Sequence, residues 1–229
     1  MTPQEVLNIL RKIDIDCSAE SFTCEQVCDY GVMWDFENFM SEHYPLVRYR
    51  IMTGATKCVI VFEDEDFVIK IPFSGYEDWE GQEYDSETGC YDENYDPFFK
   101  FECGDYCQLE EEIFNKALDE GFDFALARTQ FIGMAGDFPV YIQEKATGFC
   151  NGKSKHSREE ITLIENQYKC DIEKLDPEWI LDFISCYGKR TFEAFLQFTI
   201  DAHINDLHNG NVGYIYGQPV LFDYSGYWE

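Results

Sequence analysis

Two short polar segments near the C-terminus combine the residue types that transfer of a phosphoryl group requires. The first reads Asp206-Leu-His208-Asn-Gly-Asn211, and the second begins at Asp223 and reads Asp-Tyr-Ser-Gly. Such a transfer needs one carboxylate to orient or deprotonate the acceptor hydroxyl. It also needs an amide oxygen and a second carboxylate to hold Mg²⁺ against the phosphates. The two segments together contain a set of side chains suited to that chemistry.

The longer pattern His203-x-x-Asp206-Leu-His208-x-x-Asn211, followed by Asp223-Tyr-Ser-Gly, resembles the catalytic and metal-binding loops of the protein-kinase-like superfamily. Its Asp-Leu-His-x-x-Asn form is similar to the aminoglycoside phosphotransferase and choline kinase branch. The resemblance implies that Asp206 is the catalytic base, Asn211 a metal ligand and Asp223 the main metal ligand. His203 and His208 would support the loop, with His203 one residue further from Asp206 than the family's His-x-Asp spacing.

Earlier segments follow the order of the same family. Phe-Val-Ile-Lys70 resembles the strand whose Lys binds the α- and β-phosphates of ATP. Thr-Gly54-Ala-Thr56 stands where the Gly-rich loop over the phosphates would be, without a full G-x-G-x-x-G pattern. The resemblance therefore implies an ATP site that includes Lys70, Gly54 and Thr56.

The segments after Lys70 supply two more candidates for binding ATP. Glu110, on the next predicted helix, would pair with Lys70, and Glu111 and Glu112 are competing candidates for that pair. The segment Gln-Glu144-Lys would be the hinge whose backbone meets adenine. The implied cofactors are ATP and Mg²⁺.

Hydrophobic periodicity predicts the elements that would hold these residues. The first 45 residues have mostly helical spacing that Pro45 ends, and Asp176 followed by Pro177 marks the start of a late helix. Segment 74–105 is dense in Asp, Glu, Tyr and Gly without a sustained period, which predicts a long loop or an ordered insertion. The expected strands cover 46–52, 57–64, 66–73, 128–134 and 138–144. The expected helices cover 106–120 and 176–203. A hairpin is expected to pair 212–216 with 219–222 around Gly217-Gln218.

The pattern and the resemblance together predict an α+β fold: a bilobal protein-kinase-like fold with an antiparallel-sheet small lobe and a reduced helical large lobe. The predicted domains are an N-terminal helical extension (1–45), a small β-rich lobe with the acidic insertion (46–147), and a minimal helical lobe with the catalytic and metal loops (148–229). Because the sequence ends six residues after Asp223, where conventional kinases continue with helices that bind substrate, acceptor recognition is expected to come from elsewhere.

The composition limits the classes of partner. With 45 acidic residues against 17 Lys and Arg, the formal net charge is −28, which disfavours direct contact with nucleic-acid backbones and anionic membranes. An aromatic content of 17% excludes a disordered acidic tail. An acidic surface favours a basic protein or a polyamine-like molecule as acceptor.

The N-terminus lacks the pattern of a signal peptide, and no long apolar segment follows, so we expect a cytoplasmic protein.

The ten Cys residues carry a weaker signal. Cys24 and Cys28 stand four apart, as do Cys103 and Cys107, so each pair would share one face of a helix. A zinc site is conceivable there, but neither pair has a nearby His at ligand spacing. Reduced thiols in a core are the favoured interpretation.

The sequence is also compatible with two functions other than phosphoryl transfer. A pseudokinase-like module would bind nucleotide or a protein without turnover, which the short helical lobe favours. An acidic decoy would imitate nucleic acid to occupy a basic partner, and the dense acidic stretch 77–96 is its specific support.

Overall fold

The computed structural model is a mixed α and β protein that contains an antiparallel five-stranded sheet and helices. It divides into two compact units, of which the first comprises residues 1–106 and 131–142 and the second comprises residues 107–130 and 143–229. None of the described helices is both long and apolar enough to span a membrane. The structure describes residues 1–13, 34–53, 57–72, 74–78, 84–85, 90–91, 98–102, 105–136, 138–149, 155–168, 175–204 and 206–225.

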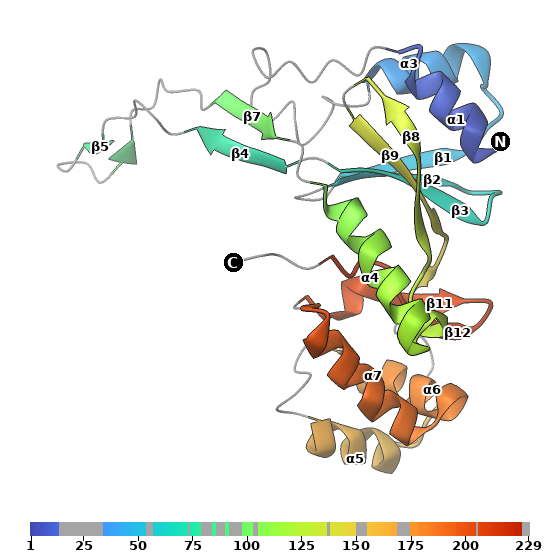
Figure 1. The fold of residues 1–229 in the computed structure, drawn as a ribbon, viewed down its shortest axis with the longest axis vertical. Helices are drawn as coiled ribbons and strands as arrows, with labels where there is room; N and C mark the ends of the chain where they lie inside the picture. The colour runs from blue at the N-terminus through green and yellow to red at the C-terminus, as the bar shows by residue number, and fades with distance from the viewer. Residues whose placement is uncertain are drawn as a thin grey trace. The chain divides into compact units, whose positions relative to one another are not determined.

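The five-stranded sheet has the strand order β1-β2-β3-β9-β8 (Figure 1). Its strands form where β-branched and aromatic residues concentrate, so all five predicted strands are confirmed, with shifts of up to three residues at their ends. In the register of β2 and β3, Val59 lies opposite Lys70. The strands are β1 (Tyr49–Thr53), β2 (Lys57–Phe62), β3 (Phe67–Pro72), β8 (Thr129–Ala135) and β9 (Phe138–Glu144).

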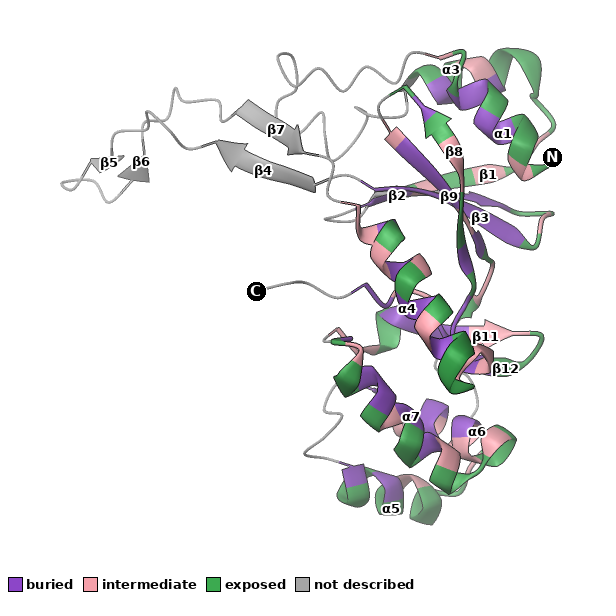
Figure 2. Ribbon diagram, in the orientation of Figure 1, coloured by how far each residue is buried: buried purple, intermediate pink, exposed green. Residues whose placement is uncertain are grey.

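Two N-terminal helices, α1 (Pro3–Leu10) and α3 (Trp34–His43), pack with the sheet in the core of the first unit. A capping box starts α1, because the hydroxyl of Thr2 accepts from the backbone of Glu5 and the Glu5 carboxylate accepts from the backbone of Thr2. Figure 2 shows the buried residues of both helices. The core side chains include Val6, Leu7, Leu10, Phe36, Met40, Ile60, Phe62, Ile69, Ile71 and Val140.

Strand β3 sends alternate side chains to opposite faces of the sheet. Phe67, Ile69 and Ile71 join the core with α1 and α3, so Lys70 points to the other face. The Lys70 side chain is nevertheless only 3% exposed. A buried ammonium group on a central strand differs from the exposed charge that protects an edge strand.

The acidic insertion contains strands of its own. Strand β4 (Ser74–Asp78) pairs antiparallel with β7 (Phe98–Glu102), and β5 (Tyr84–Asp85) pairs with β6 (Cys90–Tyr91). In the described residues of segment 74–105, the insertion therefore contains paired strands, as the second of the two predicted alternatives requires. The sequence did not reveal these strands, because the segment that contains them is rich in charge and has no sustained apolar periodicity.

The second unit joins helices to a small sheet around an aromatic core. Helix α6 begins as predicted, with Asp176 as N-cap and Pro177 at the first helical position. The ring planes of Phe183 and Phe195 stack at a centroid distance of 5.1 Å. The elements are α4 (Tyr106–Glu120), η2 (Asp123–Ala125), β10 (Thr147–Gly148), α5 (Arg158–Tyr168), α6 (Pro177–Tyr187), α7 (Lys189–Asp201), η3 (Asn209–Asn211), β11 (Val212–Ile215) and β12 (Gln218–Leu221).

The β11–β12 hairpin turns at Tyr216-Gly217, one residue before the predicted turn. Both residues have positive φ, 51° at Tyr216 and 80° at Gly217, as a two-residue hairpin turn that matches strand twist requires. Strand β10 pairs with β11 so closely that a Cβ on Gly213 would lie 2.3 Å from the backbone oxygen of Thr147. The indole nitrogen of Trp179 also donates to the Gly213 oxygen at 3.3 Å.

We expect Gly213→Ala to lower the free energy of unfolding by about 1–3 kcal/mol, because the new methyl group overlaps backbone atoms that cannot rotate away. Gly148→Ala is the matched control, since Gly148 pairs with Gly213 but has open space where its Cβ would be. Urea titrations followed by circular dichroism measure both. Equal stability of the two variants would contradict the close approach of β10 and β11.

Candidate polar loop and buried carboxylate cluster

The candidate catalytic segment follows the end of α7 in the second unit. The helix ends in a left-handed turn at His203, with φ of 55°. The backbone N–H of His203 donates to Ile200 and that of Ile204 donates to Thr199, the pair of bonds of a Schellman ending. His203 thus occupies the position that Gly usually takes, and the structure assigns it to the turn that ends α7.

The amide side chain of Asn211 closes the loop. Its Nδ2 donates to the backbone oxygen of Asp206 at 2.8 Å and to Asp206 Oδ2 at 3.2 Å. Asn211 is only 8% exposed. Because the nitrogen is used to hold Asp206, the Asn211 Oδ1 oxygen is the atom that can face a cation.

His208 supports the same carboxylate from the other side of the turn. Its Nδ1 accepts the backbone N–H of Gly210 at 2.9 Å, so the ring proton is assigned to Nε2, which lies 3.3 Å from Asp206 Oδ2. A Cβ on Gly210 would come within 2.6 Å of the imidazole, so glycine is needed for this contact. The donors from His208 and Asn211 both meet Oδ2, which leaves Asp206 Oδ1 to accept from a ligand.

Asp223 stands beside this loop through the pairing of β11 and β12. Val212 pairs with Leu221, and the next bond joins the Phe222 N–H to the Asn211 oxygen at 2.9 Å. Asp223 is therefore one residue beyond a direct backbone bond to Asn211, and it is half-buried. The structure thus brings Asp206, His208 and Asn211 together and places Asp223 in the adjoining segment.

A second polar cluster lies in the buried stripe of α4. Glu110 is fully buried, whereas Glu111 is half-buried and Glu112 exposed. Glu110 Oε2 accepts from the Thr129 hydroxyl at 3.1 Å and from the Gln143 amide at 3.2 Å. A carboxylate at such a site is retained only when hydrogen bonds compensate for its lost hydration.

Tyr224 connects this cluster with the segment of Asp223. Its hydroxyl donates to the Ala127 oxygen at 2.7 Å and lies 3.3 Å from the hydroxyl of Thr129. Burial, and then the charge of Glu110, raise the pKa of Tyr224 above its ordinary value, so the hydroxyl stays a donor. Sequence reasoning gave no role to Tyr224 or Thr129, because their partners are distant along the chain.

The other predicted ATP-binding residues belong to the first unit, lie outside the described ranges, or have contacts of their own in the second unit. Lys70 belongs to the first unit, so its pairing with Glu110 stays a prediction. Gly54 and Thr56 lie outside the described residues, as do Cys24, Cys28 and Cys103. The Glu144 carboxylate accepts the backbone N–H of Arg128 at 2.9 Å.

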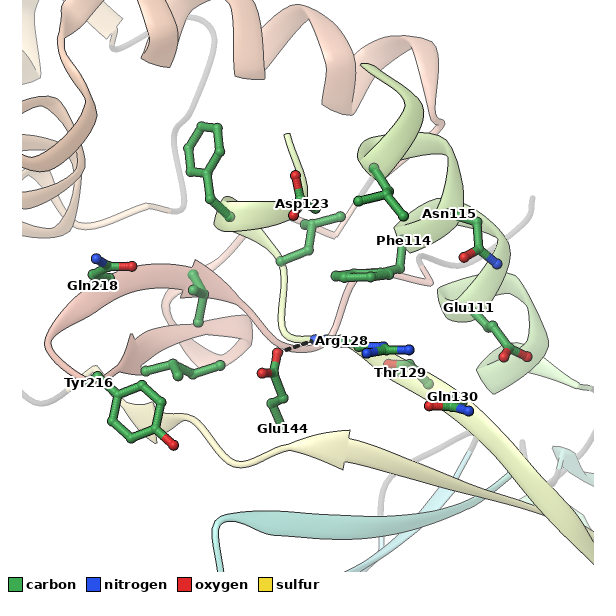
Figure 3. Close-up of a pocket in the computed structure, with 15 residues that line it drawn as sticks. Glu111, Phe114, Asn115, Asp123, Arg128, Thr129, Gln130, Glu144, Tyr216 and Gln218 are labelled. Carbon is green, nitrogen blue, oxygen red and sulfur yellow. Dashed lines mark hydrogen bonds between the residues drawn. The ribbon is translucent and has the colours of Figure 1, made fainter. Parts of the chain in front are cut away.

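Glu144 also lines a cavity of about 570 Å³ in the second unit, which the residues of the polar loop do not line (Figure 3). The cavity is bounded by α4, the start of β8 and the β11–β12 hairpin. The structure therefore assigns the Glu144 side chain to this cavity.

A third network fixes the hairpin to α6. The Tyr214 hydroxyl donates to Asp182 Oδ2 at 2.7 Å, and His156 Nε2 lies 2.9 Å from Asp182 Oδ1. Burial raises the pKa of Asp182, but these two hydrogen bonds, together with the charges of Lys155 and His156, hold that pKa below the ordinary value. Sequence reasoning missed all three residues, which belong to separate elements.

Within the described ranges, no group of three or more His, Cys, Asp or Glu residues is arranged to hold a metal ion on its own. A Mg²⁺ ion held by one or two protein oxygens and by substrate phosphates needs no such group.

No family model, no curated protein and no solved structure matches this chain significantly.

We expect Tyr224→Phe to destabilise the protein by about 1–3 kcal/mol, because it removes the donor to the buried oxygen of Ala127 and keeps the ring. Tyr216→Phe is the matched control, since Tyr216 is 90% exposed. Equilibrium unfolding in urea compares the two variants. An equal effect in both would show that the Tyr224 hydroxyl does not hold this segment.

The lowered pKa of Asp182 predicts a stability difference that depends on pH. The folded pKa lies below the ordinary value of 3.8, so the ionised carboxylate stabilises the fold above that pH. This contribution is lost as the pH falls below 3.8 through the folded pKa. The stability gap between wild type and Asp182→Asn, measured by urea unfolding from pH 7 downward, should therefore narrow in acid, and a constant gap would contradict the ionic role.

Proposed function

We propose that this chain is an ATP- and Mg²⁺-dependent phosphotransferase with a bilobal protein-kinase-like fold, which moves a phosphoryl group to a hydroxyl of a protein or small molecule. The observation that carries the proposal is the hydrogen-bonded pair of Asp206 and Asn211, with Asp223 in the adjoining segment. The spacing of these residues resembles that of kinase-like catalytic loops, and their contacts suit the same roles.

Asp206 is the residue that receives the acceptor hydroxyl. Two donors hold its Oδ2, so the hydroxyl donates to Oδ1 and gives up its proton there as its oxygen attacks the phosphorus. The Asp206 side chain is 26% exposed, which allows an acceptor to reach it. His208 positions the carboxylate rather than taking the proton itself.

The Asn211 and Asp223 oxygens suit a hard cation such as Mg²⁺. When bound, the ion neutralises charge on the phosphates. In this proposal Lys70 supplies a further positive charge for the phosphates, and Glu110 is its counter-charge. Because the chain carries a net charge of −28, these cations are needed for an anionic nucleotide to bind, and a basic acceptor is favoured.

The test separates binding from transfer. We expect calorimetry to show Mg²⁺-dependent ATP binding by the wild type, which Asp223→Ala loses. Asp206→Asn should still bind ATP. Its transfer of the ³²P-labelled γ-phosphoryl group from ATP should be about 10²–10⁴-fold slower, measured with a polyamine and with a Lys- and Arg-rich protein as acceptors. Asp201→Asn is the control, because Asp201 is an exposed carboxylate at the end of α7.

The outcomes distinguish the rival functions. Binding of Mg-ATP without transfer by the wild type would favour a nucleotide-binding module without turnover. No binding of nucleotide, or equal transfer by wild type and Asp206→Asn, would overturn the proposal.

A further inference from the structure

The cavity beside α4 has an apolar floor. Phe114, Leu126 and Val220 line it and are each at most 9% exposed (Figure 3). Its volume of about 570 Å³ is within the range of binding sites for organic ligands and short peptide segments. It lies wholly within the second unit, so one compact body forms it.

The rim of the cavity exposes two large apolar side chains to solvent. Leu118 on α4 is 56% exposed, and Tyr216 at the tip of the β11–β12 hairpin is 90% exposed. Tyr216 holds a left-handed backbone conformation, with φ of 51°, which Asn or Gly would adopt with less strain. An aromatic residue therefore stands where local backbone preference disfavours it and where its ring is available for contact.

The charges around the cavity favour a cation. Glu111, Asp123 and Glu144 contribute three carboxylates, against the single guanidinium of Arg128. An anionic ligand such as a nucleotide would meet net repulsion at this site. A positively charged ligand would be favoured both here and by the charge of the whole chain.

We propose that this cavity is a docking site for a basic, amphipathic segment of a partner protein. An apolar side chain of the segment enters over Phe114 and Val220, Tyr216 and Leu118 cover it, and neighbouring Lys or Arg side chains pair with the carboxylates. A polar rim around an apolar floor is the usual anatomy of such a contact. The proposal goes beyond phosphoryl transfer and does not rest on it.

The experiment uses the full chain without nucleotide and three blocked octapeptides as probes. The first alternates Leu or Phe with Arg or Lys, the second has Glu at the basic positions, and the third has Ser at the apolar positions. Fluorescence anisotropy of the labelled peptides gives affinity, and the NMR signals of the Asn115, Gln130 and Gln218 side-chain amides report on the cavity. We expect the first peptide alone to bind and to shift these signals.

Two rim variants test the site without disturbing its floor. Tyr216→Asn suits the positive φ and should retain the fold, yet it should weaken binding of the first peptide about tenfold. Leu118→Ser should also weaken binding of the first peptide. Leu163→Ser is the matched control, since Leu163 on α5 is 64% exposed and does not line the cavity.

Three results would overturn the proposal. One is failure of the first peptide to bind at about 1 mM. Another is equal binding of the acidic peptide, which would show that the carboxylates around the cavity do not favour a cationic segment. The third is unchanged affinity in both rim variants, which would place any bound peptide elsewhere.

Discussion

The side-chain amide of Asn211 is the contact on which the polar loop of the second unit depends. It spans the loop to reach both the backbone and the carboxylate of Asp206, while the backbone oxygen of Asn211 accepts from Phe222. One residue therefore holds the candidate catalytic carboxylate and the strand end that leads to Asp223. His208 holds the same carboxylate through its Nε2, so the amide of Asn211 and the imidazole of His208 together fix Asp206 in the loop.

The same segment continues into the interior of the second unit. Tyr224 follows Asp223 and bonds to Ala127 and Thr129, and Thr129 in turn bonds to Glu110. Tyr224, Ala127, Thr129 and Glu110 are all buried and joined by these hydrogen bonds, which makes the geometry of this inner part of the path specific rather than adaptable. Two carboxylates of different character thus occur on one connected path: a partly exposed Asp206 that can meet a substrate, and a buried Glu110 that cannot.

Sequence reasoning predicted much of the local structure, because local signals determine it. The limits of α4, the Asp176 and Pro177 start of α6, and the β11–β12 hairpin followed from periodicity, capping and turn residues. Contacts between distant segments could not be predicted in this way. Thr129 and Tyr224 are 95 residues apart, and only the fold brings them together. The strands of the acidic insertion were not predicted for a different reason: the segment around them is dense in charge, and only β7 has an apolar alternation, which is too short to stand out.

The acidic side chains of the second unit have different surroundings at its two candidate sites. In the proposed function, Asp206 and Asp223 at the polar loop are the carboxylates for the acceptor and the cation. At the cavity beside α4, Glu111, Asp123 and Glu144 surround an apolar floor instead. The first arrangement suits chemistry on a phosphate with a metal ion, and the second suits recognition of a basic segment.

A crystal structure of the protein with Mg²⁺ and a non-hydrolysable ATP analogue tests the central proposal most directly. We predict that Asn211 Oδ1 and a carboxylate oxygen of Asp223 coordinate the ion at about 2.0–2.1 Å, together with phosphate oxygens. Asp206 Oδ1 should then face the terminal phosphate without touching the metal. A nucleotide bound away from Asn211, or a metal ion held by other residues, would contradict the assignment of this loop to phosphoryl transfer.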